Sequence, residues 1–211
     1  MIKIYAAQAP GKVFKGIIRD LRAVWLMEEI GEPYELIFLK SRAEFSADWY
    51  LKLNPFGKVP TIQDGEFCLF ESAAILNYLA DKHGKFIPRA NTQERAIYDQ
   101  WMMVSVANIE SQAIRNFGYE QMLNTMPESK FIAKNALESV QSTLKVLDKE
   151  LSLRRFLCPD TFTAADIMMG SVLRYLYCQS YLSQYSNITK YLDRLYSRPA
   201  YVKAFELNGM G

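Results

Sequence analysis

The sequence is poor in the residues that hold metal ions or disulfide bonds. It has one histidine and three cysteines, and the cysteines, Cys68, Cys158 and Cys178, lie far apart with no CxxC pair. A metal site is not expected, because a structural zinc site needs about four clustered cysteine or histidine ligands. An odd number of widely spaced cysteines also argues against a disulfide framework and favours a reducing compartment.

The sequence also lacks long apolar runs and blocks of charge. No run approaches the length that spans a bilayer, and the first 16 residues lack the apolar core of a secretory signal. The 25 basic and 23 acidic residues are scattered, and the longest basic run is the pair Arg154-Arg155. We therefore expect a cytoplasmic protein whose partners include neither a membrane nor a nucleic acid.

The first 40 residues alternate between two hydrophobic periods. "IKIY" and "YELIFL" are typical of short strands, and apolar residues between positions 17 and 30 recur at helical spacing. Gly31 suits the end of that helix. A strand, a helix and a second strand at this distance predict a βαβ unit with parallel, neighbouring strands.

A hairpin and a further helix follow a linking helix or loop around residues 41–53. In "KVPTIQDGEFCLF" two apolar segments flank Asp64-Gly65, a pair suited to a tight turn. The next segment places Ile75, Leu76 and Leu79 on one helical face. The predicted order is β-α-β, a link, and then β-β-α.

The remainder of the chain shows only helical patterns. Asn91 with Glu94 predicts a helix start. Within "FTAADI", Thr163 and Asp166 form a capping box that predicts the start of another helix. We predict an α/β domain over residues 1–83, a linker over 84–91 and an all-helical domain over 92–211.

The stretch "NPFGKVPTIQDGEFCLFESAAILNYL" carries the main functional prediction. Pro60 lacks an N–H, and a cis Val59-Pro60 bond would turn the Val59 backbone groups toward a ligand that pairs like an extra strand. Glu71 and Ser72 start a helix, where unpaired N–H groups favour an anion. The pattern favours a short peptide with a terminal carboxylate. The alternative is that Pro60 only ends a strand and Glu71-Ser72 only caps a helix.

The quoted stretch, extended to "ADKHG", resembles the glutathione transferase superfamily of the cytosolic type. "RAVWLMEEIGEPYE", "FTAADIMMG" and "RLYSRPAYVKAF" resemble that family in the same order, so the resemblance covers essentially the whole chain. It implies a thioredoxin-like α/β N-terminal domain, an all-α C-terminal domain and a homodimer.

The resemblance also implies roles for five residues. Val59, beside cis-Pro60, would pair with the cysteinyl part of glutathione. Glu71 would accept from the γ-glutamyl ammonium, Ser72 would donate to the adjacent carboxylate, and Lys58 would reach the glycine carboxylate.

The sequence departs from the family where the thiol is activated. Family enzymes use a Ser, Cys or Tyr near the start of the first helix, but residues 6–24 contain no Ser, Thr, Cys or Tyr, and the matching positions are isoleucines. Three hypotheses remain open. Backbone N–H groups at residues 17–19 could stabilise the thiolate with help from Arg19 or Lys15, the Tyr5 hydroxyl could do so, or catalysis has been lost. In addition, the loop over residues 6–16 is longer than is usual for the family.

The resemblance implies that the second substrate binds over the long helix that begins near residue 91. Tyr98, Met102, Ser105 and Asn108 are the candidates for its pocket, and ordinary core and interface packing is the alternative for each of them. The expected activity is conjugation of glutathione, as co-substrate, to small hydrophobic electrophiles in detoxification, or a related glutathione-dependent reaction. The alternative is a non-catalytic glutathione-binding or regulatory protein on the same fold.

Overall fold

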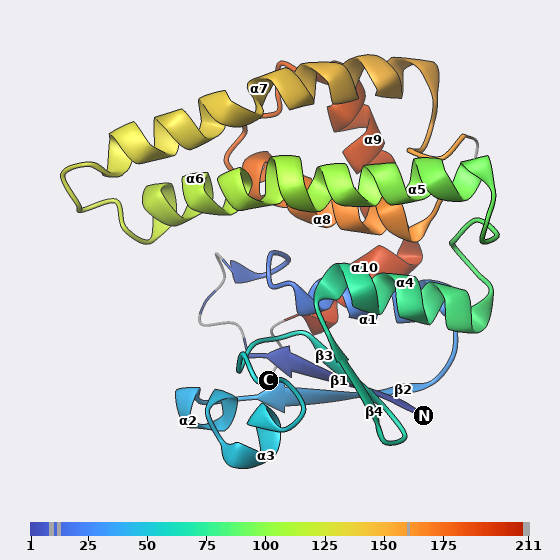
Figure 1. The fold of residues 1–211 in the computed structure, drawn as a ribbon. Coiled ribbons are helices and arrows are strands. Elements are labelled where there is room, and N and C mark those ends of the chain that lie inside the picture. The colour runs from blue at the N-terminus through green and yellow to red at the C-terminus, as the bar shows by residue number, and fades with distance from the viewer. Residues whose placement is uncertain (9–10, 12–13, 160, 209–211) are drawn as a thin grey trace. The chain divides into compact units, whose positions relative to one another are not determined.

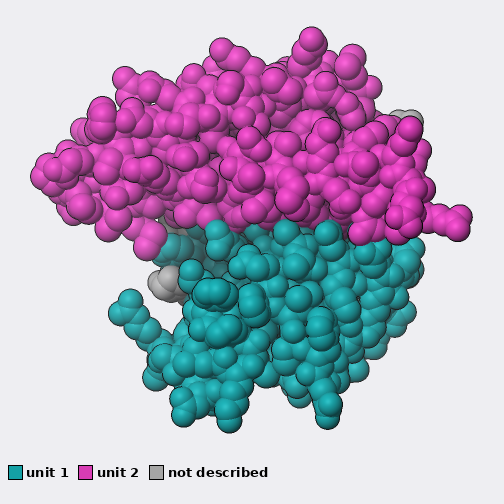
Figure 2. Space-filling view, viewed as in Figure 1, with its two compact units in different colours: residues 1–87, 196–211 teal, residues 88–195 magenta. Residues whose placement is uncertain are grey.

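The computed structural model describes residues 1–8, 11, 14–159 and 161–208 (Figure 1). Two compact units are present: Met1–Ile87 with the segment from Tyr196 onward, and Pro88–Leu195 (Figure 2). The division predicted from the sequence lies close to the first boundary but assigns the C-terminal segment to the helical part. That segment joins the first unit because it packs on the first helix of the α/β part, as described below.

The first unit is built on a four-stranded sheet in the order β2-β1-β3-β4. The elements of this unit are β1 (Ile2–Ala7), α1 (Asp20–Ile30), β2 (Tyr34–Leu39), α2 (Arg42–Phe45), α3 (Asp48–Leu51), β3 (Thr61–Asp64), β4 (Phe67–Phe70), α4 (Ser72–His83) and α10 (Pro199–Leu207). Strands β1 and β2 are parallel neighbours, whereas β3 runs antiparallel to both β1 and β4. The predicted βαβ unit, the hairpin and the thioredoxin-like fold class are confirmed.

Local sequence signals explain most of these boundaries. Gly31 ends α1 with φ at 80°, a left-handed conformation that only glycine adopts at little cost. The hairpin turn consists of Gly65 and Glu66, one position later than expected, because Asp64 still pairs with Phe67. Helix α1 begins at Asp20 rather than near Ile17, since the preceding residues form tight turns with bonds from residue i+3 to residue i.

The two faces of the sheet are covered by different elements (Figure 1). Helices α1 and α4 pack on one face, and α10 packs along α1. The other face bears a cluster in which Tyr5 and Leu39 contact Tyr50 of α3. Tyr5 points to this face and not toward α1, because side chains alternate between the two faces of a strand.

The C-terminal segment is attached to α1 by both apolar and ionic contacts. The rings of Trp25 and Tyr201 meet edge to face with centroids 4.8 Å apart. Arg198 makes a two-point ion pair with Glu29, with N–O distances of 2.6 and 2.7 Å. Paired guanidinium–carboxylate contacts of this kind are geometrically specific, so α10 belongs to the α/β unit.

The second unit contains only helices among its described elements. These are α5 (Gln93–Met103), the π-helical segment η2 (Val104–Glu110), α6 (Ser111–Gln121), α7 (Ser129–Leu153), α8 (Ala164–Tyr177) and α9 (Ser186–Tyr196), whose last residue belongs to the first unit. Thr92, rather than Asn91, caps α5, since its Oγ1 accepts from the N–H of Arg95. Asn91 cannot be this cap, because its φ of 62° is not the extended conformation that a cap residue adopts.

The capping box of α8 is confirmed and extends into a larger polar network. The carboxylate of Asp166 is fully buried and accepts from the N–H groups of Thr163 and Leu157, at 2.8 and 2.9 Å. It also accepts from the Tyr191 hydroxyl of α9 at 2.9 Å. One side chain thus ties the start of α8 to a preceding loop and to another helix. None of the described helices has both the length and the apolar character to cross a membrane.

Candidate functional site

The loop that precedes β3 is held in place by two side chains that the sequence did not identify. The Tyr50 hydroxyl donates to the carbonyl oxygen of Lys58 at 2.6 Å, and Asn54 Nδ2 donates to the same oxygen at 2.8 Å. Both groups also contact the Thr61 hydroxyl, at 2.9 and 3.1 Å. Burial raises the pKa of Tyr50 to about 12, which keeps this donor protonated at neutral pH. These bonds hold residues 58–61 against α3 and the segment that follows it.

A glycine is required just before this loop. Gly57 has φ at 56°, and a Cβ there would lie 2.5 Å from the carbonyl oxygen of Phe45. No larger residue could keep the chain so close to α2, because such a contact is well inside van der Waals distance. Gly57 therefore sets the direction in which Lys58 and Val59 leave the turn.

The Val59-Pro60 peptide bond is cis, as expected. Within the described part of the chain, neither the N–H nor the C=O of Val59 has a hydrogen-bond partner. Pro60 is buried, Val59 is half-buried and Lys58 is exposed. The backbone of Val59 can therefore pair with an extended ligand in the manner of an added strand.

The start of α4 carries the second half of the site. Glu71 has φ at 70° and ψ at 110°, a conformation that is rare for a residue with a side chain. Its carboxylate is exposed and makes no ion pair among the described residues. Strained backbone of this kind persists where the surrounding structure enforces it, and it is frequent at ligand sites.

Ser72 follows Glu71 and is positioned by a buried cation. Arg22 Nη1 donates to Ser72 Oγ at 2.7 Å, and Arg22 is fully buried. Since this bond uses a lone pair of the hydroxyl, the Ser72 proton remains available for an acceptor at the helix start. The first N–H groups of α4 point toward the same place, so the site suits a carboxylate. The sequence missed Arg22, because an arginine among apolar helix residues has no distinguishing spacing.

The strand register brings the two halves of the site to one edge of the sheet. Tyr5 is opposite Thr61, so continuation of the register sets Val59 against Ala7 at the end of β1. From Ala7 the chain leads to the start of α1, where Arg22 reaches across to Ser72. The described structure thus gathers the Val59 backbone, the start of α4 and the start of α1.

The start of α1 is organised around Asp20. This buried carboxylate accepts from the N–H of Ala7 at 2.8 Å and from Asn208 Nδ2 at 2.5 Å. Burial raises the pKa of Asp20 to about 7, and the N–H donors lower it by less. Among the described residues, the N–H groups of Ile18 and Asp20 have no partner. Backbone donors are therefore present at the position where the sequence offers no hydroxyl.

The two candidates for thiol activation lie in different surroundings. Arg19 directly precedes α1 and is half-exposed, close to these N–H groups. The Tyr5 hydroxyl donates to Gln63 Oε1 at 3.1 Å, and its ring packs against Trp49 and Tyr50 on the α3 side. Burial raises the pKa of Tyr5. The structure brings Arg19, but not the Tyr5 hydroxyl, to the start of α1. Part of the long loop, residues 9–10 and 12–13, lies outside the described residues.

The residues expected to line the second-substrate pocket share one helical face in the other unit. Tyr98, Met102 and Ser105 are fully buried. The Ser105 hydroxyl donates to the Trp101 carbonyl at 2.8 Å and lies 3.7 Å from Met169 Sδ of α8. Their role toward a substrate stays a prediction.

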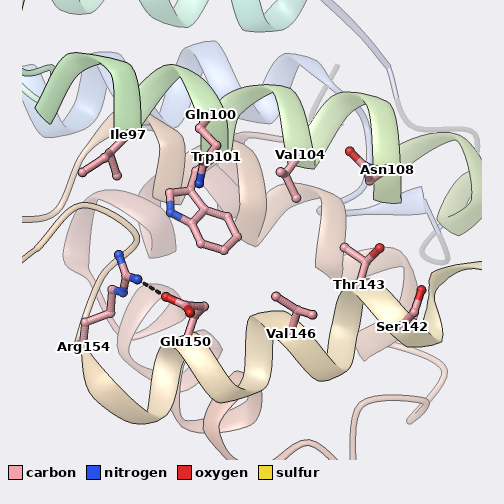
Figure 3. A pocket seen from close by; sticks show the side chains of 10 residues that line it. All are labelled: Ile97, Gln100, Trp101, Val104, Asn108, Ser142, Thr143, Val146, Glu150 and Arg154. Atoms are coloured by element: carbon pink, nitrogen blue, oxygen red, sulfur yellow. Dashed lines mark hydrogen bonds and ion pairs between the residues drawn. The ribbon is translucent and has the colours of Figure 1, made fainter. Parts of the chain in front are cut away.

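The neighbouring face of the same helix lines a cavity of about 500 Å³ inside the helical unit. Figure 3 shows Trp101 and Val104 facing Val146 of α7 across it, with the Arg154–Glu150 ion pair at one end. Of the residues expected to bind either substrate, Asn108 alone lines this cavity. Ile97, Trp101, Val104 and Asn108 recur at helical spacing and share the face that lines it. No cluster of three or more potential metal-ligating side chains occurs among the described residues.

Comparison with known proteins agrees with this geometry. Residues 9–81 match the family of the glutathione S-transferase N-terminal domain, and residues 104–199 match that of the C-terminal domain. The chain is 30% identical to glutathione S-transferase 1 of Zea mays over 210 residues, covering 94% of this chain and 97% of the maize protein. It is also 30% identical to the probable glutathione S-transferase GSTF2 of Oryza sativa subsp. japonica, covering 88% and 90% of the two chains.

Solved structures show the same architecture. A glutathione transferase family member from Pseudomonas fluorescens, with two glutathione molecules bound, has a TM-score of 0.85 and 25% identity, covering 97% of this chain and 92% of its own. A glutathione S-transferase-I bound with lactoylglutathione has a TM-score of 0.84 and 28% identity, covering 98% and 99%.

Proposed function

Because this chain belongs to the glutathione S-transferase family, we propose that it is a glutathione transferase that conjugates glutathione to small hydrophobic electrophiles. The observation that carries the proposal is the strained Glu71 next to the Arg22-bound Ser72, at the same sheet edge as the unpaired Val59 backbone. This combination fits a peptide with a free amino acid end. Similar proteins are solved with glutathione bound, which supports the same ligand here.

Each part of glutathione has a matching group in the proposed complex. The γ-glutamyl carboxylate would accept from the Ser72 hydroxyl and from the first N–H groups of α4, while its ammonium would pair with Glu71. The cysteinyl backbone would pair with Val59 beside Pro60. The exposed Lys58 would reach the glycine carboxylate, a contact open to solvent and therefore weak.

The thiol would lie next to the start of α1. Proton loss from the thiol precedes attack on the electrophile, because the thiolate is the nucleophile. We propose that the N–H groups of Ile18 and Asp20 and the positive end of α1 stabilise this thiolate, with Arg19 nearby. Tyr5 is the less favoured candidate, since its hydroxyl bonds to Gln63.

We further propose that the protein acts as a cytoplasmic homodimer in detoxification, and that Tyr98, Met102 and Ser105 contribute to binding of the electrophile. Light scattering at micromolar concentration checks the dimer, and a mass corresponding to one chain would contradict it. Substitution of Met102 by Ala should change the electrophile preference while leaving glutathione affinity unchanged.

The second candidate function is glutathione binding without catalysis. The lack of any Ser, Thr, Cys or Tyr side chain over residues 6–24 favours it. Calorimetry with glutathione, together with conjugation assays on an aryl halide and an epoxide and a reduction assay on an organic hydroperoxide, separates the two candidates. Turnover with any of these supports the transferase, whereas binding without turnover and without a bound thiolate near pH 7 supports the binding protein.

A further inference from the structure

Asn208, near the C-terminal end, bridges two parts of the site that are distant from it in sequence. Its Oδ1 accepts from the N–H of Gly16 at 2.7 Å, and its Nδ2 donates to Asp20 Oδ1 at 2.5 Å. The other oxygen of Asp20 accepts from the N–H of Ala7. The Asn208 amide therefore joins the turn before α1 to the first residue of α1, and Asp20 extends this connection to the end of β1.

This bridge is buried and geometrically selective. Asn208 and Asp20 are 3% and 1% exposed. An amide is the group that fits, because it presents one acceptor to an N–H and one donor to a carboxylate. Asn208 directly follows α10, and its N–H donates to the Ala204 carbonyl at 2.9 Å. Replacement of either partner would leave a buried polar atom without a bond.

The bridge acts on the segment where the side chains for thiol activation are missing. Gly16 and Asp20 flank residues 17–19, so their fixation determines where the N–H groups of this turn point. Lys15, which lies over the Phe205 ring of α10 at 5.2 Å, is held by the same element. Without the bridge, the Gly16 N–H would lose its acceptor and Asp20 would lose its bond to the C-terminal segment.

We infer that Asn208 is a positioning residue for the thiol end of the site: it holds the turn of residues 16–20 so that its backbone N–H groups stabilise the glutathione thiolate. The inference rests on the proposed function. Backbone N–H groups then perform the task that a hydroxyl or thiol side chain performs elsewhere in the family, and the C-terminal segment positions them. Asn208 does not contact the reacting atoms itself.

The test uses two single variants and their reciprocal combination in the full-length protein. Asn208→Ala removes both arms of the bridge, and Asn208→Asp retains an acceptor for Gly16 but faces Asp20 with a like charge. In the double variant Asp20→Asn with Asn208→Asp, the amide and carboxylate exchange places. The amide now at position 20 would donate to the carboxylate at position 208 and still accept from Ala7, so every bond of the bridge is restored.

Three quantities are measured: the Kd for glutathione by calorimetry, the pKa of the bound thiol by ultraviolet absorption, and kcat. Both single variants should raise the thiol pKa by about one unit and lower kcat at neutral pH roughly tenfold, with Kd changed less than about threefold. The double variant should recover most of both losses. Lys203→Ala, which breaks an outer ion pair between α10 and Glu28, is the control and should leave all three values unchanged.

Hydrogen exchange at the Gly16 amide detects the bridge independently of activity. It should be faster in Asn208→Ala, which removes the acceptor of this N–H, and unchanged in Asn208→Asp, which keeps one. The inference is overturned if the single variants keep the thiol pKa and kcat of the unchanged protein, or if the double variant recovers neither. Failure of the unchanged protein to bind glutathione would instead overturn the proposed function, and this inference with it.

Discussion

Arg22 and Ser72, on two different helices, share a buried hydrogen bond of 2.7 Å from the guanidinium Nη1 to the hydroxyl oxygen. The bond links the first turn of α1 to the first turn of α4. The proposed carboxylate end and the proposed thiol end of the site are thereby connected by one contact. It also directs the hydroxyl proton of Ser72 away from α1.

Substitution of Ser72 by Ala should weaken glutathione binding. A hydrogen bond to a charged group contributes about 1.5 to 3 kcal/mol, so Kd should rise roughly ten- to a hundredfold. The variant should also lose thermal stability, because Arg22 Nη1 loses a buried acceptor. Calorimetry measures the first effect and thermal unfolding the second. Ser139→Ala, on an exposed face of α7, is the control, and an unchanged Kd in Ser72→Ala would refute the assigned role.

Replacement of Glu71 should separate stability from binding. Glu71→Gly relieves a positive φ and should raise the free energy of unfolding by about 1 kcal/mol, while it removes the partner of the ligand ammonium and raises Kd at least about tenfold. Glu71→Ala removes the same carboxylate but keeps the strain, so it should lose affinity without gaining stability. Equal melting temperatures for the two variants would contradict the strain argument.

Asp166→Ala should destabilise the protein without affecting the ligand site. Loss of a helix cap alone typically costs about 1 kcal/mol, but here the N–H groups of Leu157 and Thr163 and the Tyr191 hydroxyl would also lose a buried acceptor. We expect a loss of about 3 to 5 kcal/mol in denaturant unfolding. Asp99→Ala, which breaks a half-exposed ion pair with Arg95, should cost less than about 1 kcal/mol.

Asp20 should make stability depend on pH. Its pKa is about 7 in the folded protein, whereas the ordinary value is 3.8. Between about pH 4 and about pH 7 the folded state therefore holds a proton on Asp20 that the unfolded state has lost. The contribution of Asp20 to the free energy of unfolding should therefore decrease as the pH rises from about 4 to about 7, and stay constant above that. The total change is on the order of 4 kcal/mol.

The difference in unfolding free energy between the unchanged protein and Asp20→Asn isolates this contribution, since all other carboxylates cancel. As the pH rises across that range, the free energy of unfolding of the unchanged protein should decrease relative to that of Asp20→Asn. A difference that is independent of pH between about 4 and 8 would show that Asp20 is ionised throughout.

The sequence predicted those features that depend on neighbouring residues. The βαβ unit, the hairpin, the end of α1 at Gly31 and the capping box at Thr163 each follow from a spacing of at most a few residues, or from one hydrophobic period. The closeness of Val59, Glu71 and Ser72 also follows from short spacing, because they lie within two strands and a turn of one another, and their role in binding a peptide stays a prediction. A small error, Asn91 in place of Thr92 as the cap of α5, arose because both of these adjacent residue types are common helix caps and the sequence does not show their backbone conformations.

Only the tertiary structure decided how the site is supported. Tyr50 and Asn54 hold the Lys58 carbonyl, and Arg22 holds Ser72, through single side-chain bonds that leave no period in the sequence. Asp20 and Asn208 lie 188 residues apart in the chain, and each looks like an ordinary surface residue when taken alone. Their pairing depends on α10 folding back along α1, and burial then makes the bond obligatory, because neither polar group can reach water.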